Sequence, residues 1–343
     1  RYGTVTGVQT CALPICIHPV SPPSPELVIA KQRTLAWDTL FPEGEIVNNK
    51  PRPGMHLFTV NSGSHVHLSV SSAEEAVGIT NVFNGFAGAQ IALMGNSSVW
   101  KGKVDSEFQC VAEKFWDWWM LDEARVGLPN RCFTDIEDYG NAIAKLRPFY
   151  VVRNEIPILI NDYATFADYY DCSPAIGKYL SGEQVDVYPE AKDIKLHNSF
   201  YWFTARISRY FTVENRLCDQ QVPGNLACPA ALSLGLLKAL PEAQEELKQF
   251  QWSTLKLMRE AAMREGLDAE VKGIELADMA KKMLDLAILG LERRGLGEEV
   301  YLEPLKQRLI SKQNPAVKAS EIFNQGGIKA LIKARDILVA SSK

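Results

Sequence analysis

Two histidines separated by a single residue, His65 and His67, lie in a stretch, 55–70, whose composition predicts one or two strands. Because alternate side chains of a strand share a face, the pattern places both imidazoles on one polar face and the residues between them towards the core. Gly63 would let a ligand approach the backbone closely. Two imidazoles on one face could hold a metal ion or a phosphate, and they could equally be surface histidines of an edge strand.

A second group of polar residues lies in the stretch 206–219. Period two predicts that Thr212, Glu214 and Arg216 share one face of a strand, with apolar residues on the other. A carboxylate beside a guanidinium has two interpretations: a structural ion pair, or a Mg²⁺ ligand beside a planar fork that holds phosphate oxygens. The residues alone leave both open.

A pair of histidines on a strand is also typical of metal-dependent hydrolases, which need further histidine or aspartate ligands downstream. The chain has five histidines, and His197 is the one that follows His67. The sequence is therefore short of ligands for a hydrolase, which stays as the alternative enzyme class. No Walker-type phosphate loop and no Gly-x-Gly-x-x-Gly occurs, so a bound nucleotide would require another architecture.

The chain of 343 residues carries a formal net charge of −4, which gives no electrostatic reason to expect nucleic acid or an anionic membrane as a partner. Its longest weakly polar stretches, such as 85–95, are too short to span a bilayer. Seven cysteines without a Cys-x-x-Cys pair, and no recognisable signal peptide, predict reduced thiols and a cytoplasmic location.

Periodicity and capping patterns predict both helices and strands. Helices are expected over 26–35, over 72–94 behind a Ser72-x-x-Glu75 capping box, over 107–124 and from Thr134, and strands over 55–70, 149–160 and 199–217. After Pro229, helical spacing dominates to residue 340. Strands with one polar face followed by a run of helices predict an α+β fold with a helical C-terminal third, rather than a doubly wound parallel sheet.

The first residues require separate treatment. Residues 5–15 resemble translated sequencing-adapter DNA, so 1–16 are expected to be non-native and are left out of the fold prediction. The sequence has no initiating Met, and the gene is expected to begin upstream. Residues 17–343 are expected to form one catalytic domain, with the sheet in 17–225 and helices in 226–343.

Four motifs occur in an order that resembles a known family. They are Gly63-Ser64-His65-Val66-His67-Leu68, the turn Ala92-Leu93 to Trp100-Lys101-Gly102, the pair Arg206-Ile207-Ser208 and Thr212-Val213-Glu214-Asn215-Arg216-Leu217-Cys218-Asp219, and Arg264-Glu265-Gly266-Leu267-Asp268-Ala269. Together they are similar to motifs of the glutamate–cysteine ligase and carboxylate–amine ligase family, a branch of the glutamine-synthetase-like superfamily. The resemblance covers roughly residues 55 to 300.

The resemblance implies a funnel-shaped, mainly antiparallel sheet flanked by helices, with ATP and Mg²⁺ inside; Mn²⁺ would suit an imidazole ligand better. It assigns His65 and Glu214 as metal ligands. It assigns Arg216 and Arg206 to catalysis and to phosphate or carboxylate contacts, and Arg264 with them to cofactor binding. His67 would only orient its neighbour.

The implied reaction joins an amino-acid carboxylate, expected to be the γ-carboxylate of glutamate, to an amine, expected to be cysteine, as in glutathione biosynthesis. An acyl phosphate would be the intermediate. The partners would be small amino acids, with neither nucleic acid nor membrane, and a homo-oligomer is left open. The alternatives are the hydrolase that uses His65 and His67, and a noncatalytic relative that binds a ligand.

The sequence also departs from the family pattern. The family begins its sheet with a strand bearing Gly-x-Glu-x-Glu, and none precedes His65; Glu43-Gly44-Glu45 has a similar spacing but lies among loop signals. The chain is therefore expected to lack its first strand and, on its own, to be inactive or nearly so. Ser97-Ser98 replaces the usual Ser-Pro, which leaves the substrate open. The aromatic run 115–119 is expected to be core rather than an adenine platform.

Overall fold

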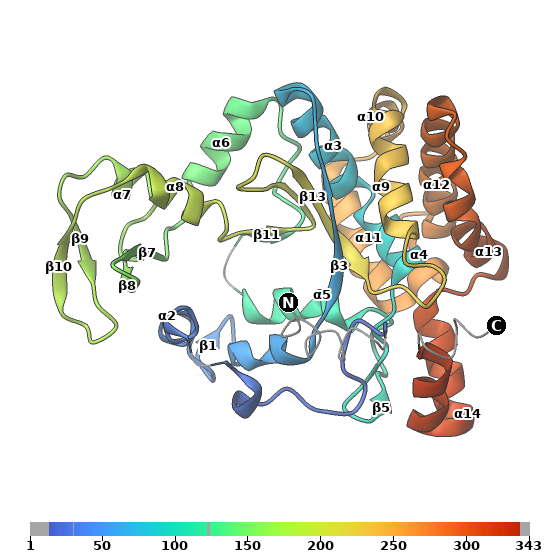
Figure 1. Ribbon diagram of the computed structural model, residues 1–343, viewed down its shortest axis with the longest axis horizontal. Helices are drawn as coiled ribbons and strands as arrows, with labels where there is room; N and C mark the ends of the chain where they lie inside the picture. The colour runs from blue at the N-terminus through green and yellow to red at the C-terminus, as the bar shows by residue number, and fades with distance from the viewer. Residues whose placement is uncertain (1–13, 30, 122–123, 337–343) are drawn as a thin grey trace.

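The computed structural model describes residues 14–29, 31–121 and 124–336. Helices and largely antiparallel strands build it together, which confirms the predicted α+β class. In Figure 1 a small central sheet lies between a layer of helices and an arm of strands that extends to the left. The N-terminal part of the chain crosses below this sheet.

The central sheet has three antiparallel strands in the order β12 (Ala205–Ile207), β13 (Val213–Asp219) and β3 (Gly63–Leu68). One row across it aligns Arg206 with Glu214 and Glu214 with His67. The register then shifts between Asn215 and Cys218, so that two residues of β13 lie opposite one residue of β3. This β-bulge changes which side chains share a face.

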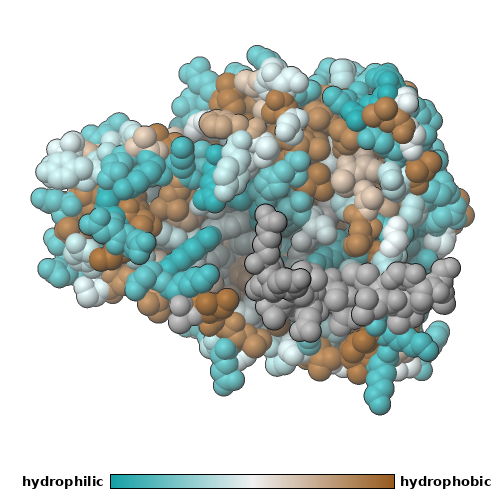
Figure 2. Space-filling model, in the orientation of Figure 1, coloured by the Kyte–Doolittle hydropathy of each residue, from teal (hydrophilic) through white to brown (hydrophobic). Residues whose placement is uncertain are grey.

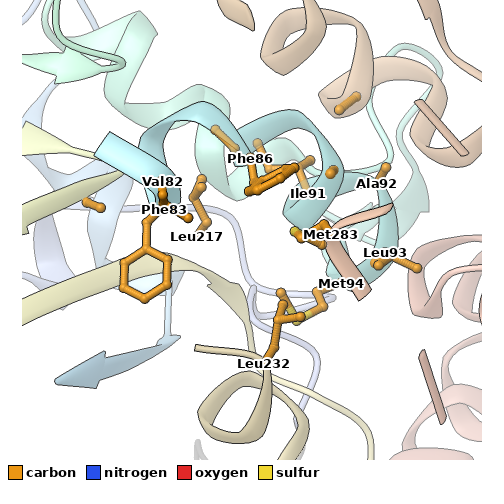
Figure 3. Close-up of a cluster of buried hydrophobic side chains, with 14 of the residues drawn as sticks. Val82, Phe83, Phe86, Ile91, Ala92, Leu93, Met94, Leu217, Leu232 and Met283 are labelled. Carbon is orange, nitrogen blue, oxygen red and sulfur yellow. The ribbon is translucent and has the colours of Figure 1, made fainter. Parts of the chain in front are cut away.

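Helices cover the other face of this sheet. α3 (Ala73–Gly85) and α4 (Ala87–Met94) lie against β13, and α9 (Cys228–Lys238), α11 (Trp252–Glu265) and α12 (Leu276–Arg294) pack behind them. Figure 3 shows the apolar contact itself, where Leu217 of β13 lies near Val82 and Phe83 of α3, and Leu232 lies near Met94. This buried layer is the largest apolar cluster of the described chain, and it anchors the strands that carry the polar groups.

Two of these helices approach unusually closely. A side-chain carbon at Gly290 of α12 would lie 2.0 Å from the carbonyl oxygen of Gly235 in α9, and one at Gly235 would lie 2.2 Å from the carbonyl oxygen of Ala287. Such a separation leaves no space for a side chain on either helix, so the contact requires glycine at both positions.

The predicted helix over 72–94 is broken at Phe86 into α3 and α4, which are bent by 57°. Its start agrees with the prediction, because the Ser72 hydroxyl accepts a hydrogen bond from the backbone N–H of Glu75. No single helix of the described residues has the length and apolarity to cross a membrane, although the bent pair α3–α4 meets both criteria together.

The arm contains a four-stranded antiparallel sheet in the order β10 (Gln184–Val187), β9 (Ala175–Lys178), β8 (Ile156–Leu159) and β7 (Tyr150–Arg153). Of these strands, β7 and β8 confirm the strand prediction for 149–160. On the face in Figure 2 the surface is hollowed between this arm and the rest of the molecule. The arm therefore forms one side of a depression beside the central sheet.

The C-terminal part of the chain is helical, as predicted, through α10 (Leu240–Leu247), α13 (Glu303–Ser311) and the kinked α14 (Pro315–Arg335). The remaining elements are η2 (Pro25–Leu27), α2 (Gln32–Leu40), β1 (Ile46–Val47), β2 (Lys50–Pro51), β4 (Val99–Trp100), β5 (Lys103–Val104), α5 (Val111–Trp119), β6 (Val126–Gly127), α6 (Ile136–Ala144), α7 (Phe166–Tyr170), α8 (Ala191–His197), β11 (Trp202–Phe203), η4 (Gly266–Asp268), β14 (Glu270–Val271), β15 (Ile274–Glu275) and η5 (Glu298–Leu302).

Several predicted elements differ from the structure. The helix expected over 26–35 is replaced by η2 and by α2, which begins at Gln32, and the strand expected over 199–217 is divided into β11, β12 and β13. The first part of the predicted strand 55–70 is a 3₁₀-helix, η3 (Met55–Val60), because its apolar residues Leu57 and Val60 pack on one side of a turn. The helix expected over 107–124 is confined to α5. The helix expected from Thr134 begins after Asp135, whose carboxylate accepts from the N–H of Asp138.

The structure tests the predictions for the N-terminal segment only in part. Residues 1–13 of the expected non-native segment lie outside the described residues, whereas Ile15 and Cys16 are buried. The backbone N–H of Ser62 donates to the carbonyl of Cys16, and Ile17 bridges Asn61. This pairing lies just before the start of β3 at Gly63, and the expected missing strand stays a prediction.

Candidate active site

Glu214 lies at the centre of a cluster of charged side chains on the polar face of the central sheet. Its Oε2 accepts a hydrogen bond from Nε of Arg206 at 2.7 Å, and its Oε1 accepts one from Nη1 of Arg216 at 2.9 Å. Nδ1 of His65 lies 3.1 Å from Oε1. Because the carboxylate is only 4% exposed, these contacts are made in a largely water-excluded environment.

The charges of this cluster perturb one another. Burial acts to raise the pKa of Glu214, but the hydrogen bond with His65 and the charges of Arg216 and Arg206 hold it well below its usual range. Burial and the neighbouring arginines lower the pKa of His65, which favours its neutral form. Two guanidinium groups against one carboxylate leave a net positive charge, so the cluster can attract an anion such as a phosphate.

The bulge in β13 brings a further carboxylate to this face. Without it, period two would direct Asp219 to the side opposite Glu214 and Arg216. With one extra residue in the strand, Leu217 keeps the core position that simple alternation gives it, while Asp219 turns back to the polar face. The Asp219 carboxylate accepts from the N–H of Asn96 at 2.6 Å.

A cavity of about 260 Å³ lies on one side of the cluster, and we call it the acidic cavity. Its wall combines aromatic rings with two carboxylates that are not part of the cluster. The lining residues are Cys16, Phe58, Asn61, Gly63, His65, Ala112, Glu113, Trp116, Trp202, Phe203, Thr204, Arg216 and Asp219.

A second cavity, of about 310 Å³, reaches Glu214 from another direction, and we call it the basic cavity. It contains three arginines for one carboxylate, and it is bordered by tyrosine and serine hydroxyls. The lining residues are Arg33, His67, Tyr150, Leu196, Asn198, Ser199, Trp202, Arg206, Ser208, Arg209, Tyr210 and Glu214. The two cavities share Trp202, and each is lined by residues of the charged cluster.

The structure brings together four of the predicted site residues: His65, Glu214, Arg206 and Arg216. It does not bring Arg264 to them. That side chain pairs with Glu107 and lies over the ring of Phe108, 4.5 Å from its centroid, and it lines neither cavity. The position of Arg264 therefore offers no support for the predicted contact with a cofactor.

Other site residues could not be predicted. Glu113 faces the acidic cavity from α5, which is far from the β3 and β13 motifs in the sequence. In the neighbouring aromatic run, Phe115 and Trp119 are buried core residues, as predicted. Trp116 differs, because it lines the acidic cavity and stacks on Trp202 with the ring centroids 5.2 Å apart.

His65 and Glu214 fit a metal ion that takes most of its ligands from water and substrate phosphates rather than from the protein. Among the described residues no group of three or more His, Cys, Asp or Glu side chains could hold a metal ion. His65 and Glu214 supply two neighbouring donors. Mg²⁺ is commonly held by one or two carboxylates, with water and substrate phosphates as its other ligands. The pair is compatible with that arrangement, and it is short of the three protein ligands typical of a catalytic zinc site.

The protein has an α+β fold and a net positive cluster of two arginines, a glutamate and a histidine. Because residues of this cluster line two cavities, the site is suited to bring an anionic group beside a second substrate. The sequence profile of glutamate-cysteine ligase family 2 (GCS2) matches residues 53–334, and the chain belongs to this family. Membership implies ligase chemistry of the glutamate–cysteine ligase and carboxylate–amine ligase group. No curated protein matches the chain.

Proposed function

We propose that the protein joins the γ-carboxylate of glutamate to the amine of cysteine at the expense of ATP, through an acyl phosphate. The observation that carries the proposal is the net positive cluster around Glu214, whose side chains line both the basic and the acidic cavity. A carboxylate becomes reactive towards an amine once it is phosphorylated, and guanidinium groups can stabilise the charge of the transferring phosphoryl group.

The chain's own residues would divide this work. Arg216 and Arg206 hold phosphate oxygens by exchanging part of their contact with Glu214 for the ligand. His65 and Glu214 would hold Mg²⁺, or Mn²⁺ in its place, which supplies charge neutralisation at the phosphates. The three strands β12, β13 and β3 would form part of a glutamine-synthetase-like funnel. The aromatic wall of the acidic cavity limits access of water, which would otherwise hydrolyse an acyl phosphate.

The test uses the full-length protein. We expect ADP release that requires glutamate, Mg²⁺ and an amine together, and a product whose mass equals glutamate plus amine minus water. ATP binding without glutamate-dependent ADP release would instead support a noncatalytic relative. Stoichiometric zinc in the purified protein, with hydrolysis of an ester or amide, would support the hydrolase that uses His65 and His67.

A further inference from the structure

Glu113 has a half-buried carboxylate whose negative charge is only weakly paired. Its side chain is 14% exposed, and within the described chain its ion pair is a long one, from Oε2 to Nη2 of Arg259 at 3.5 Å. Arg259 is shared with Asp117, one helical turn further along α5, whose Oδ2 lies closer to it at 3.2 Å. The guanidinium is therefore drawn towards Asp117, and Glu113 keeps acceptor capacity that faces the acidic cavity.

Several charged groups act on Glu113 from the elements around it. They are Arg259 of α11, Asp117 of the same helix, and Asp219 and Arg216 of β13. Burial, with the neighbouring carboxylates, outweighs the two arginines and raises the pKa of Glu113 to about 7. Such a carboxylate can exchange a proton near neutral pH, as a general base must.

The other carboxylate of the cavity is already engaged. Oδ2 of Asp219 accepts from the N–H of Asn96 at 2.6 Å and from the thiol of Cys110 at 3.4 Å. Its Oδ1 accepts at 3.0 Å from the thiol of Cys16, a residue of the segment that is expected to be non-native. These contacts make Asp219 part of the wall. Burial raises the pKa of both carboxylates, but Glu113 keeps more acceptor capacity towards a ligand.

The remaining wall of the acidic cavity suits an ammonium group. Phe58, Trp116, Trp202 and Phe203 line the cavity. The rings of Trp116 and Trp202 are stacked on each other with an angle of 21° between their planes, and the guanidinium of Arg216 lies over Trp116, 5.8 Å from its centroid. Aromatic faces attract cations, and the attraction grows when water is excluded. Together with Glu113, these rings would favour a protonated amine over an anionic substrate, which the basic cavity would favour instead.

We propose that the acidic cavity binds the amine substrate as an ammonium ion and that Glu113 is the catalytic residue that accepts its proton. This inference rests on the proposed function. The proton moves from the ammonium to Glu113, and the freed lone pair attacks the acyl carbon. The C–N bond forms as the carbon–oxygen bond to phosphate breaks. Phosphate leaves with the second N–H proton, and Glu113 returns its proton to water.

The test compares two nucleophiles in the full-length gene product with ATP and glutamate. The amine of cysteine is protonated near neutral pH, whereas hydroxylamine is largely neutral and yields a hydroxamate that forms a coloured complex with Fe(III). In Glu113→Gln, kcat/KM for cysteine should fall about 10²- to 10⁴-fold, as expected for a lost general base, while hydroxamate formation stays close to that of the wild type. In the wild type, kcat/KM for cysteine should rise with pH through about 7, and this limb should be absent in Glu113→Gln.

Asp117→Asn is the matched control, because it changes a carboxylate on the same helix with the same arginine but does not line the cavity. Cysteine ligation should persist, with its rising limb displaced to lower pH, because Arg259 can then pair with Glu113. Glu113→Asp keeps a carboxylate and should retain a pH-dependent rate even if Glu113→Gln folds poorly.

The outcomes distinguish the role of Glu113 from the proposed ligase activity. Equal losses of cysteine and hydroxylamine reactions in a folded Glu113→Gln, or no loss of either, would overturn the role of Glu113 and leave the ligase proposal standing. Absence of glutamate-dependent ADP release and of hydroxamate in the wild type would overturn the proposed function itself.

Discussion

His67 lies directly opposite Glu214 in the antiparallel register, yet its nearest imidazole atom is 3.7 Å from that carboxylate, whereas His65 reaches it at 3.1 Å. Nδ1 of His67 instead bonds to Thr212 at 2.9 Å. The two histidines of one strand therefore have different partners, and they should respond differently to substitution.

We predict that His65→Ala lowers metal-dependent ADP release about 10²-fold or more, as for a lost electrostatic stabiliser, while His67→Ala changes it only a few-fold. The physical reason is that His65, which lies 3.1 Å from Oε1 of Glu214, would be one of the two protein ligands of the proposed metal. The measurement is ADP release against Mg²⁺ and Mn²⁺ concentration in the full-length gene product. Equal losses at both positions would favour a site with two histidine ligands, and with it the hydrolase.

Glu214→Gln and Arg216→Met should each lower the rate by about 10²- to 10³-fold, because both side chains serve one phosphoryl transfer. The double variant should be little slower than the poorer single variant. Melting temperatures will also fall, since removal of one partner leaves a buried charge uncompensated. A change in stability alone therefore does not identify catalysis at this pair.

Asp193→Asn is the control for that experiment. Asp193 is 1% exposed and accepts two hydrogen bonds from Arg153 of β7, at 2.8 and 2.7 Å, in the arm. Its loss should lower the melting temperature and leave ADP release per folded molecule nearly unchanged. If the Glu214 and Arg216 variants behave in the same way, they form a structural ion pair only.

The agreement between sequence and structure follows from the range of the interactions involved. Alternation along β13 predicted that Glu214 and Arg216 share a face, because that is a property of a few neighbouring residues. The bulge that turns Asp219 to the same face depends on pairing with β3, some 150 residues away, and has no local signal. Likewise, Glu113 faces the cavity because of the way α5 packs in the folded chain. Its spacing along the helix predicts only that the side chain is half-buried.

Acid should destabilise the protein through His197. This ring stacks on Phe166, its Nε2 donates to the carbonyl of Ile143 at 2.9 Å, and it is 4% exposed. Burial lowers its pKa from 6.5 to about 4. The unfolded chain therefore binds a proton that the folded chain does not between these values, so stability is full above pH 6.5 and is lost as the pH falls towards 4. The loss is about 3 kcal/mol at most.

The check is denaturant unfolding at several pH values for the wild type and His197→Gln. The variant should be less stable at neutral pH, yet its free energy of unfolding should change less between pH 6.5 and 4. Parallel curves for the two proteins would show that His197 is not the titrating group.

Gly290→Ala should be strongly destabilising, by about 1–3 kcal/mol or more, because the new methyl group would meet the backbone of α9. Gly140 offers the matched control: it lies in α6, and a methyl carbon there would meet nothing within 4 Å. Gly140→Ala should stabilise by about 0.5–1 kcal/mol. Chemical denaturation of both variants measures the difference, and similar stabilities would contradict the close approach of α9 and α12.

The bulge in β13 has one more consequence, for how this strand can vary. Its single additional residue reverses the alternation of side chains. Each later position that would face the cavity faces the core, and each that would face the core faces the cavity. Deletion of Leu217 would restore simple alternation and keep Asp219 on the face of Glu214 and Arg216, whereas straightening the strand with every residue kept would direct Asp219 towards α4. The bulge, and not the composition of the strand, therefore determines which face Asp219 takes.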